Sequence, residues 1–376
     1  MPLSNRVINT SSVLLIQFVT FLFIFKYSER FSHSYFLSFL FSLVYCAFVC
    51  ISLLKVDTHD FDNSKFWNKK GYVLFILVIS LLFVILINIV PESSQVSRLP
   101  AMNGWLSNLC AGKYPYNSQY NPSGFPILFF IAFPFYLMHN LGYLEVLGYL
   151  LFSITILIYS SSIKDTIIRT LIFLTLPMFF YEIIVRSELF FNIVLTIYLI
   201  IITKKYLLNN KIDIPFILTS VMYGLLLSTR LVVGIVIAIF TVHLFRNNLK
   251  MTIPFALICG ITFFATLIPF IVWDKIYFIS NGPFSIQLLY LPRIVIVAVP
   301  LLILYFAYFL KKIREVLFYN GIVLFALVLI SFISHCVTYG LYESIFQRPY
   351  FDISYFIFPI PFLILSISNP ILFEEK

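Results

Sequence analysis

The sequence predicts an all-α integral membrane protein with about twelve transmembrane helices. Of the 376 residues, 61% are apolar and only 11% are charged, whereas charged residues make up about 25% of a soluble domain. The mean hydropathy is +0.99. Apolar runs recur along the chain, and most reach the length that a helix needs to cross about 30 Å of hydrocarbon. These runs are too long and too continuously apolar for barrel strands, and a backbone in lipid must satisfy its own hydrogen bonds, so helices are the predicted structure.

Each predicted span corresponds to one apolar run. The first run follows Arg6 but has no small-residue cleavage site at its end, so we expect a retained span rather than a signal peptide. The runs of roughly 17 residues or more, all long enough to cross a bilayer, are 11–27, 34–54, 72–91, 141–160, 167–184, 252–273, 289–310, 316–337 and 353–370. The shorter runs are 124–138, 189–203, 213–229 and 231–245. A total of about twelve spans, between 11 and 13, follows from these runs.

Basic residues set the predicted orientation. They gather in four connections: Lys55, Lys65, Lys69 and Lys70 in one, Lys204, Lys205 and Lys211 in another, Arg246 and Lys250 in a third, and Lys311, Lys312 and Arg314 in a fourth. Loops rich in Lys and Arg face the cytoplasm, so both termini are expected inside and residues 92–125 outside. The formal charge of +9 reflects this bias, and we expect membrane lipids but no nucleic acid as partners.

Counting crossings predicts one segment that does not span. Two external connections must be separated by an even number of crossings, yet the runs 124–138, 141–160 and 167–184 would make three. The run 124–138 is short and carries Pro126 and Pro134. A broken or re-entrant helix is tolerated where protein or a water-filled cavity surrounds it, so this run is predicted to be re-entrant or partly inserted.

Residues 92–125 form the one long polar connection of a single membrane domain, 1–376, and chemistry is expected there. Flat aromatic side chains and an amide in this loop suit sugar rings, although interfacial Trp and Tyr also serve as membrane anchors. Both interpretations stay open for the aromatics. The candidate sugar- or acceptor-binding residues are Trp105, Tyr114, Tyr116, Tyr120 and Asn121.

Charged residues of both signs are predicted on the outer face. Ionisable groups near a membrane are costly to bury and are therefore candidates for function; the alternative is a set of solvated or mutually paired interfacial charges. The residues are Glu92, Arg98, Lys113, Glu182, Arg186, Glu188, Arg230, Asp274, Lys275, Arg293, Glu343, Arg348 and Asp352. Together they predict a polar cavity, in which a carboxylate could act as a general base and Arg or Lys could hold a phosphate.

Cysteine and histidine give no sign of a metal centre. The five cysteines and five histidines show no metal-ligand spacing, and no site made of these residues alone is expected. Cys110 is the one cysteine expected in a loop, so a structural disulfide is not predicted. The chain has neither a phosphate-cradling Gly-rich loop nor a nucleophile elbow.

Three motifs carry a family resemblance over roughly residues 72 to 250. Glu92 opens the long loop, Gly112-Lys113-Tyr114-Pro115-Tyr116 follows about twenty residues later, and Asn121-Pro122-Ser123-Gly124-Phe125-Pro126 leads into the next helix. The second motif is LTLPMFFYEIIVRSELFFN, which contains Pro177, and the third is Arg230 in LLLSTRLVVG. These elements resemble the GT-C class of polytopic glycosyltransferases, which use polyprenyl-phosphate sugars. The class typically places an Asp, often an acidic pair, in the first loop, whereas this loop has only Glu92.

The resemblance implies a GT-C-like fold in the cytoplasmic (inner) membrane and a defined reaction. A sugar would pass, with inversion, from a polyprenyl-phosphate donor to a lipid-linked glycan or cell-envelope polysaccharide on the external face. Glu92 would be the catalytic base, and Glu188 a second acid that orients the acceptor or binds a divalent metal such as Mg²⁺ or Mn²⁺. The implied ligands of the donor phosphate are Arg98, Lys113, Arg186, Arg230 and Arg348.

Two other functions stay open. A polymerase of polysaccharide repeat units, of the O-antigen or capsule type, would also hold a polyprenyl diphosphate with external arginines, and Arg293 and Arg348 would then matter more than Glu92. A lipid or solute transporter would show inverted repeats and polar or Gly/Pro breaks in the middle of its spans. The sequence shows no such paired breaks.

Overall fold

The computed structural model describes residues 4–55, 68–91, 98–208, 211–287, 292–347 and 350–367, and the regular elements in these ranges are all helices. The chain divides into two compact units. Unit 1 comprises Met1–Phe83, Tyr149–Glu182 and Lys311–Lys376, and unit 2 comprises Val84–Gly148 and Ile183–Leu310.

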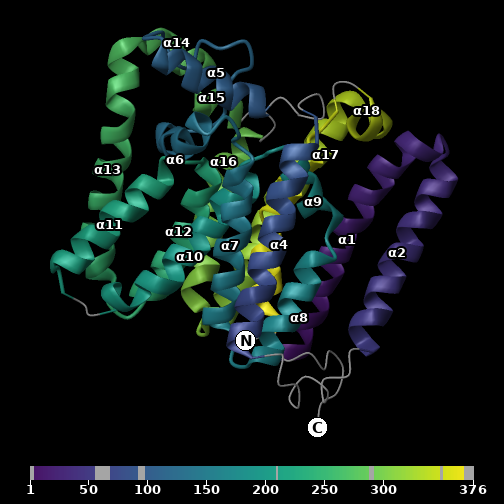
Figure 1. Ribbon diagram of the computed structural model, residues 1–376. Helices are drawn as coiled ribbons and strands as arrows, with labels where there is room; N and C mark the ends of the chain where they lie inside the picture. The colour runs from purple at the N-terminus through teal and green to yellow at the C-terminus, as the bar shows by residue number, and fades with distance from the viewer. Residues whose placement is uncertain are drawn as a thin grey trace. The chain divides into compact units, whose positions relative to one another are not determined.

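Unit 1 contains the N-terminal helical hairpin and the last helices of the chain (Figure 1). Ser4 starts the first helix by accepting a hydrogen bond from the Val7 amide, and His33 ends it in a left-handed conformation. The helices are α1 (Asn5–Ser32), α2 (Tyr35–Lys55), most of α4 (Lys69–Ile89) and α7 (Tyr143–Tyr159), α8 (Ile163–Leu174), α9 (Pro177–Ile184), α17 (Ile313–Tyr339), α18 (Leu341–Phe346), the 3₁₀ helix Ile353–Ile357 and α19 (Ile360–Ser366). Large apolar side chains are exposed along α2 and α4, as expected of helices that face lipid.

Unit 2 contains the helices that position the candidate site. They are α5 (Arg98–Cys110), α6 (Pro126–Leu137), α10 (Leu189–Leu207), α11 (Ile214–Leu227), α12 (Leu231–Phe245), α13 (Thr252–Trp273), α14 (Lys275–Asn281), α15 (Pro283–Gln287) and α16 (Arg293–Phe309), with the 3₁₀ helix Leu249–Met251 before α13. The short helices α5, α14 and α15 gather near one end of α13 (Figure 1). The described part of the polar loop, 98–125, packs against the end of α13 and against α14: the Tyr114 ring lies 5.8 Å from Trp273 and 5.7 Å from Tyr277 between centroids.

The predicted helical membrane architecture is confirmed in its coarse form. Among the described residues, α1, α2, α4, α10, α13 and α17 are long and apolar enough to cross a membrane, by length and composition; α8 and α9 together add a seventh candidate. Six further apolar helices in the described ranges are shorter. A count of twelve spans and a GT-C-like arrangement stay predictions.

The structure departs from the predicted spans in two places. The run 167–184 is not one straight helix but the pair α8 and α9, bent by 65°. Pro177 starts α9; its ring disfavours a helical conformation in the preceding residue and it lacks an N–H, which explains the break. The described part of the run 353–370, which ends at residue 367, likewise divides into a 3₁₀ helix and α19, with Pro359 and Pro361 at the junction.

The polar loop and the run after it each contain a helix. Residues 98–110, expected as part of a loop, form the 13-residue helix α5. The run 124–138 forms α6, which has 12 residues. At about 1.5 Å per residue, α6 is about 18 Å long, well short of the ~30 Å hydrocarbon core. Its length suits partial insertion, which stays a prediction.

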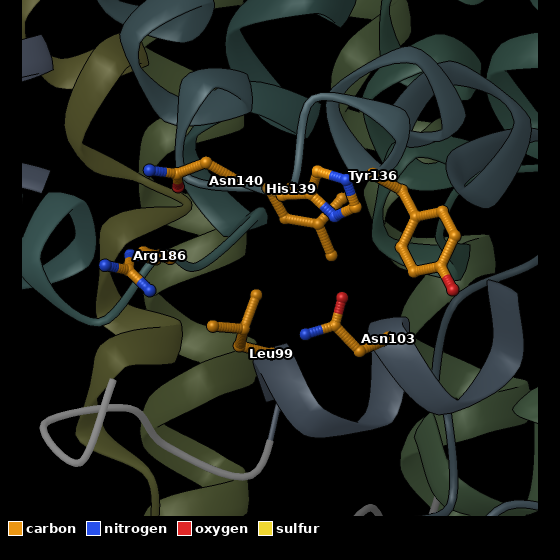
Figure 2. Close-up of a pocket in the computed structure, with 7 residues that line it drawn as sticks. Leu99, Asn103, Tyr136, His139, Asn140 and Arg186 are labelled. Atoms are coloured by element: carbon orange, nitrogen blue, oxygen red, sulfur yellow. The ribbon is translucent and has the colours of Figure 1, made fainter. Parts of the chain in front are cut away.

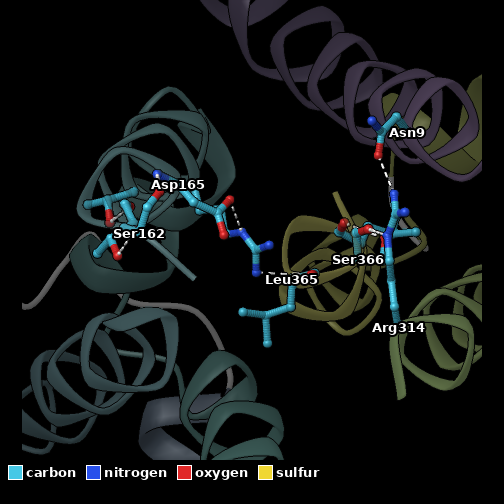
Figure 3. Close-up of polar contacts among 10 residues, drawn as sticks. Asn9, Ser162, Asp165, Arg314, Leu365 and Ser366 are labelled. Carbon is cyan, nitrogen blue, oxygen red and sulfur yellow. Dashed lines mark hydrogen bonds and ion pairs between the residues drawn. The ribbon is translucent and has the colours of Figure 1, made fainter. Parts of the chain in front are cut away.

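Two arginines hold the end of α19 inside unit 1 (Figure 3). Arg169 donates through Nη1 to the Leu365 carbonyl (3.1 Å) and through Nε to the Asp165 carboxylate (2.9 Å). Arg314 donates through Nε to the Ser366 carbonyl (2.6 Å). The last carbonyls of a helix have no partner within the helix and carry partial negative charge, so two guanidinium groups stabilise this end.

Candidate functional site

A buried ion pair lies at the centre of the candidate site in unit 2. Glu188 immediately precedes α10 and Arg230 immediately precedes α12. Arg230 donates through Nη2 to Glu188 Oε1, and the two side chains are 3% and 2% exposed, respectively. Charges this deeply buried persist only when they are paired and hydrogen-bonded. The structure therefore brings together two residues that the sequence predicted as parts of one site.

The Pro-rich motif of the polar loop meets this pair. Arg230 Nη2 also donates to the Ser123 hydroxyl (3.2 Å). Two backbone hydrogen bonds join the same motif to the turn between α11 and α12: Phe125 N to Thr229 O and Ile127 N to Ser228 O, both 3.0 Å. Segments about one hundred residues apart in the sequence, each part of the GT-C resemblance, are thus hydrogen-bonded to one another.

Gln287, the last residue of α15, closes the site from a third segment. Its Nε2 donates to the Ser123 carbonyl (2.5 Å), and its Oε1 accepts from the Leu231 amide (2.9 Å). One side chain thereby ties the loop to the start of α12. Sequence reasoning missed Gln287, because a single glutamine in a polar connection carries no spacing signal. The sequence marks Ser123 only as one residue of the Asn121–Pro126 motif.

The pair retains polar atoms that can accept or donate further hydrogen bonds. Within the described residues, Glu188 Oε2, Arg230 Nε and Asn192 Oδ1 are buried and have no hydrogen-bond partner. Asn192 is itself oriented by its Nδ2, which donates to the Glu188 carbonyl (2.9 Å). Buried polar atoms of this kind are costly unless water or a ligand engages them. The site has the donors and acceptors that a polar ligand would need.

A cavity of about 280 Å³ lies in the same unit. Arg186, two residues before Glu188, lines it and is 6% exposed. Arg186 Nη2 donates to the carbonyls of Ile87 (2.7 Å) and Val90 (3.1 Å), at the end of α4. Figure 2 shows the lining side chains, which are Leu99, Asn103, Tyr136, His139, Asn140, Leu141 and Arg186.

Arg98 joins the loop helix to the same turn. It is the first residue of α5, is 8% exposed, and donates through Nη1 to the Ser187 hydroxyl (2.8 Å). Three of the predicted phosphate ligands, Arg98, Arg186 and Arg230, are therefore buried and contact or belong to the 186–188 turn. Lys113, by contrast, is exposed.

The predicted sugar-binding aromatics fall into two groups. Trp105 and Tyr116 are fully buried, and Trp105 stacks on Phe129 at 4.2 Å between ring centroids. Tyr116 donates to the Gly124 carbonyl (3.2 Å), and burial raises the pKa of its phenol well above the ordinary value of 10, which keeps this donor protonated. In this structure both rings are packed against other rings.

The remaining predicted sugar- or acceptor-binding residues are more accessible. Tyr120 and Asn121 are exposed, and Tyr114 is half-buried with its hydroxyl donating to the Phe270 carbonyl (3.3 Å). Burial, together with the charge of Asp274, raises the pKa of Tyr114. Tyr114, Tyr120 and Asn121 thus keep an exposed surface that a ligand could reach.

Two predicted site residues, Glu92 and Arg348, lie outside the described residues. Within the described ranges, no group of three or more His, Cys, Asp or Glu side chains is placed to hold a metal ion. Comparisons of the chain with models of known families, with curated proteins and with solved structures found no match.

Proposed function

We propose that this protein is a membrane glycosyltransferase that moves a sugar from a polyprenyl-phosphate donor to a lipid-linked glycan or cell-envelope polysaccharide. One observation carries the proposal: the buried Glu188–Arg230 pair is hydrogen-bonded to Ser123 in the Asn121–Pro126 motif. One residue from each of the three segments that resemble the GT-C class therefore takes part in a single set of contacts within unit 2, although nothing in the sequence spacing requires it.

The proposed reaction assigns a role to each group. The acceptor hydroxyl attacks the anomeric carbon, the bond from that carbon to the donor phosphate oxygen breaks, and the polyprenyl phosphate leaves with the electron pair. A guanidinium held in place before the reaction stabilises the charge that develops on the leaving phosphate, and we assign this role to Arg230. Glu188 and Ser123 orient Arg230 through their hydrogen bonds. Glu92 is the proposed base for the acceptor proton.

The test is mass spectrometry of envelope glycans from a deletion strain of the source organism. The strain is complemented with the wild-type chain, with Glu92→Gln or with Arg230→Lys, and membrane expression is verified by immunoblot. Arg230→Lys keeps the charge but replaces the planar guanidinium, whose Nη2 donates to both Glu188 and Ser123, with a compact ammonium group. We expect glycans short of one sugar in the deletion strain and in both variants.

Asp213→Asn is the matched control for carboxylate removal. Asp213 caps α11 by accepting from the Phe216 amide, and Asn caps equally well, so this strain should make the wild-type glycan. Shorter polymers built of intact repeat units would replace the proposal with the polymerase. An unchanged glycan in the deletion strain would contradict both and favour transport.

A further inference from the structure

The cavity beside Arg186 is built from three separate segments of unit 2 (Figure 2). Helix α5 contributes Leu99 and Asn103, and the turn between α9 and α10 contributes Arg186. The end of α6 and the turn after it contribute Tyr136, His139, Asn140 and Leu141. Asn103 and His139 are exposed, whereas Arg186 is buried. The cavity thus has an accessible polar rim and a buried cationic side chain.

Two of the lining residues have an unusual backbone. Three non-glycine residues in the described chain have a positive φ angle; His139 (57°) and Arg186 (55°) both line this cavity. His139 follows α6 at a position where helices commonly end with glycine. Such conformations cost free energy for side-chain-bearing residues and concentrate at ligand sites. A histidine and an arginine at these two positions indicate that their side chains are needed there.

The side chains around Arg186 are also fixed. A Cβ atom on Gly142 would lie 2.9 Å from Arg186 Cγ, so the glycine leaves room for the arginine stem. Asn140 is held through its Oδ1 by the Gly142 amide (3.0 Å) and through its Nδ2 by Asn88 Oδ1 (3.3 Å). Together with the two carbonyls that hold Arg186 Nη2, these contacts preorganise the lining. A preorganised lining lowers the entropy cost of binding.

Charge and size restrict the occupant. Arg186 carries the only fixed charge among the seven described residues that line the cavity, and none of them is acidic. Guanidinium groups match carboxylate and phosphate oxyanions. The volume of about 280 Å³ is just below that of pockets for drug-sized ligands, about 300–1,000 Å³. Amide, imidazole and phenol groups suit hydroxyls, and Leu99 and Leu141 suit the apolar face of a sugar ring.

We infer that this cavity binds an anionic monosaccharide, with the oxyanion directed to Arg186 and the sugar hydroxyls to Asn103, Tyr136 and His139. The oxyanion is a carboxylate or a phosphate ester. This inference goes beyond the proposed function, and its test measures binding without any transfer reaction. A failed binding test therefore does not contradict the proposed transfer reaction, and a failed transfer test does not contradict this inference.

The test is isothermal titration calorimetry on the full chain in phosphatidylcholine nanodiscs, which carry no anionic lipid. The probes are glucuronate, glucose 1-phosphate and glucose. A single charge-assisted contact in a buried site predicts that at least one anionic sugar binds about tenfold or more tightly than glucose. Tighter binding of glucuronate identifies a carboxylated sugar as the ligand class, and tighter binding of glucose 1-phosphate identifies a phosphate ester.

Variants at the exposed rim of the cavity test binding without removing a buried side chain. Asn103→Trp fills the mouth of the cavity from the exposed face of α5 and should weaken binding about tenfold or more. Ser107→Trp, one turn along the same helix and also exposed, is the matched control and should leave affinity unchanged. His139→Gly should weaken binding while the unfolding temperature stays the same or rises, because glycine accepts the left-handed backbone. Equal affinity for glucose and both anions, or unchanged affinity in Asn103→Trp, would overturn the inference.

Discussion

Glu188 and Arg230 form an ion pair in which each residue immediately precedes a helix. A carboxylate at a helix N-terminus is favoured by the helix dipole, whereas a cation there is disfavoured. Arg230 therefore occupies an electrostatically unfavourable position at the start of α12, and the Glu188 carboxylate offsets this cost. The helix dipole therefore does not account for a cation at this position, and its stability depends on the pairing with Glu188.

Removing the carboxylate should expose this cost. Glu188→Gln leaves Arg230 buried without its counter-charge, and breaking a buried pair on one side costs about 3–5 kcal/mol. We expect a corresponding loss in the free energy of unfolding, measured by chemical denaturation in detergent. The double variant Glu188→Gln, Arg230→Gln removes both charges and should recover part of the loss. A single variant as stable as the wild type would show that the pair is not maintained in the membrane protein.

Gln287 provides a second test of the same constellation. Gln287→Ala removes two hydrogen bonds, one to the Ser123 carbonyl and one from the Leu231 amide. Both partners are half-buried, and because leaving a fully buried polar group unsatisfied costs about 1–3 kcal/mol, the low end of that range applies. We expect a lower unfolding midpoint and faster amide hydrogen exchange at Leu231. Gln347→Ala, at an exposed glutamine of unit 1, should change neither the unfolding midpoint nor the exchange at Leu231. Equal effects of the two variants would argue against a specific role for the two Gln287 hydrogen bonds.

Much of the helical layout follows from sequence because the apolar runs are long and their ends are marked. The run 252–273 corresponds to α13, and 231–245 to α12, with the same bounds. Charged residues mark the ends: Arg230 and Arg246 flank the run 231–245, and Asp274 follows the run 252–273. The break within 167–184 was harder to predict, because Pro177 could start, kink or end a helix and only packing decides among these outcomes.

The candidate site was predictable as a set of residues but not as a set of contacts. Arg230 and Glu188 stood out because charges near a membrane are costly. The sequence contains no signal that Ser123 would contact Arg230, since that contact depends on the path of the loop. Residues such as His139 and Asn103 carry no charge pattern or motif spacing, and only the folded cavity brings them together.

His139→Gly should stabilise the protein. The left-handed conformation costs a non-glycine residue about 1–2 kcal/mol, and glycine adds about 0.5–1 kcal/mol of chain entropy to the unfolded state. The net expected gain is about 0.5–1 kcal/mol. Met138→Gly, one residue earlier with a φ of −81°, has no such strain to relieve and should destabilise. A loss of stability in His139→Gly would mean that the imidazole makes compensating contacts.

The arginines that hold α19 predict a local effect in unit 1. Arg169→Leu removes the donor to the Leu365 carbonyl and the partner of Asp165. Hydrogen bonds to charged groups contribute about 1.5–3 kcal/mol, so residues 360–367 should exchange amide hydrogens faster. Lys164→Gln removes a neighbouring positive charge without these contacts and serves as the control. Unchanged exchange in Arg169→Leu would assign the holding of α19 to Arg314 alone.

Two glycines in facing helices of unit 2 should respond oppositely to the same substitution. A Cβ on Gly224 in α11 would lie 2.6 Å from the Cys259 carbonyl oxygen and 2.6 Å from Thr262 Cβ in α13, whereas a Cβ on Gly260 would meet nothing within 4 Å. Gly224→Ala must push the two helices apart, and overpacking costs about 1–3 kcal/mol. Gly260→Ala should gain up to about 1 kcal/mol, because alanine is the better helix former. Thermal unfolding in one detergent measures both, and a stabilising Gly224→Ala would show that α11 and α13 are not in close contact.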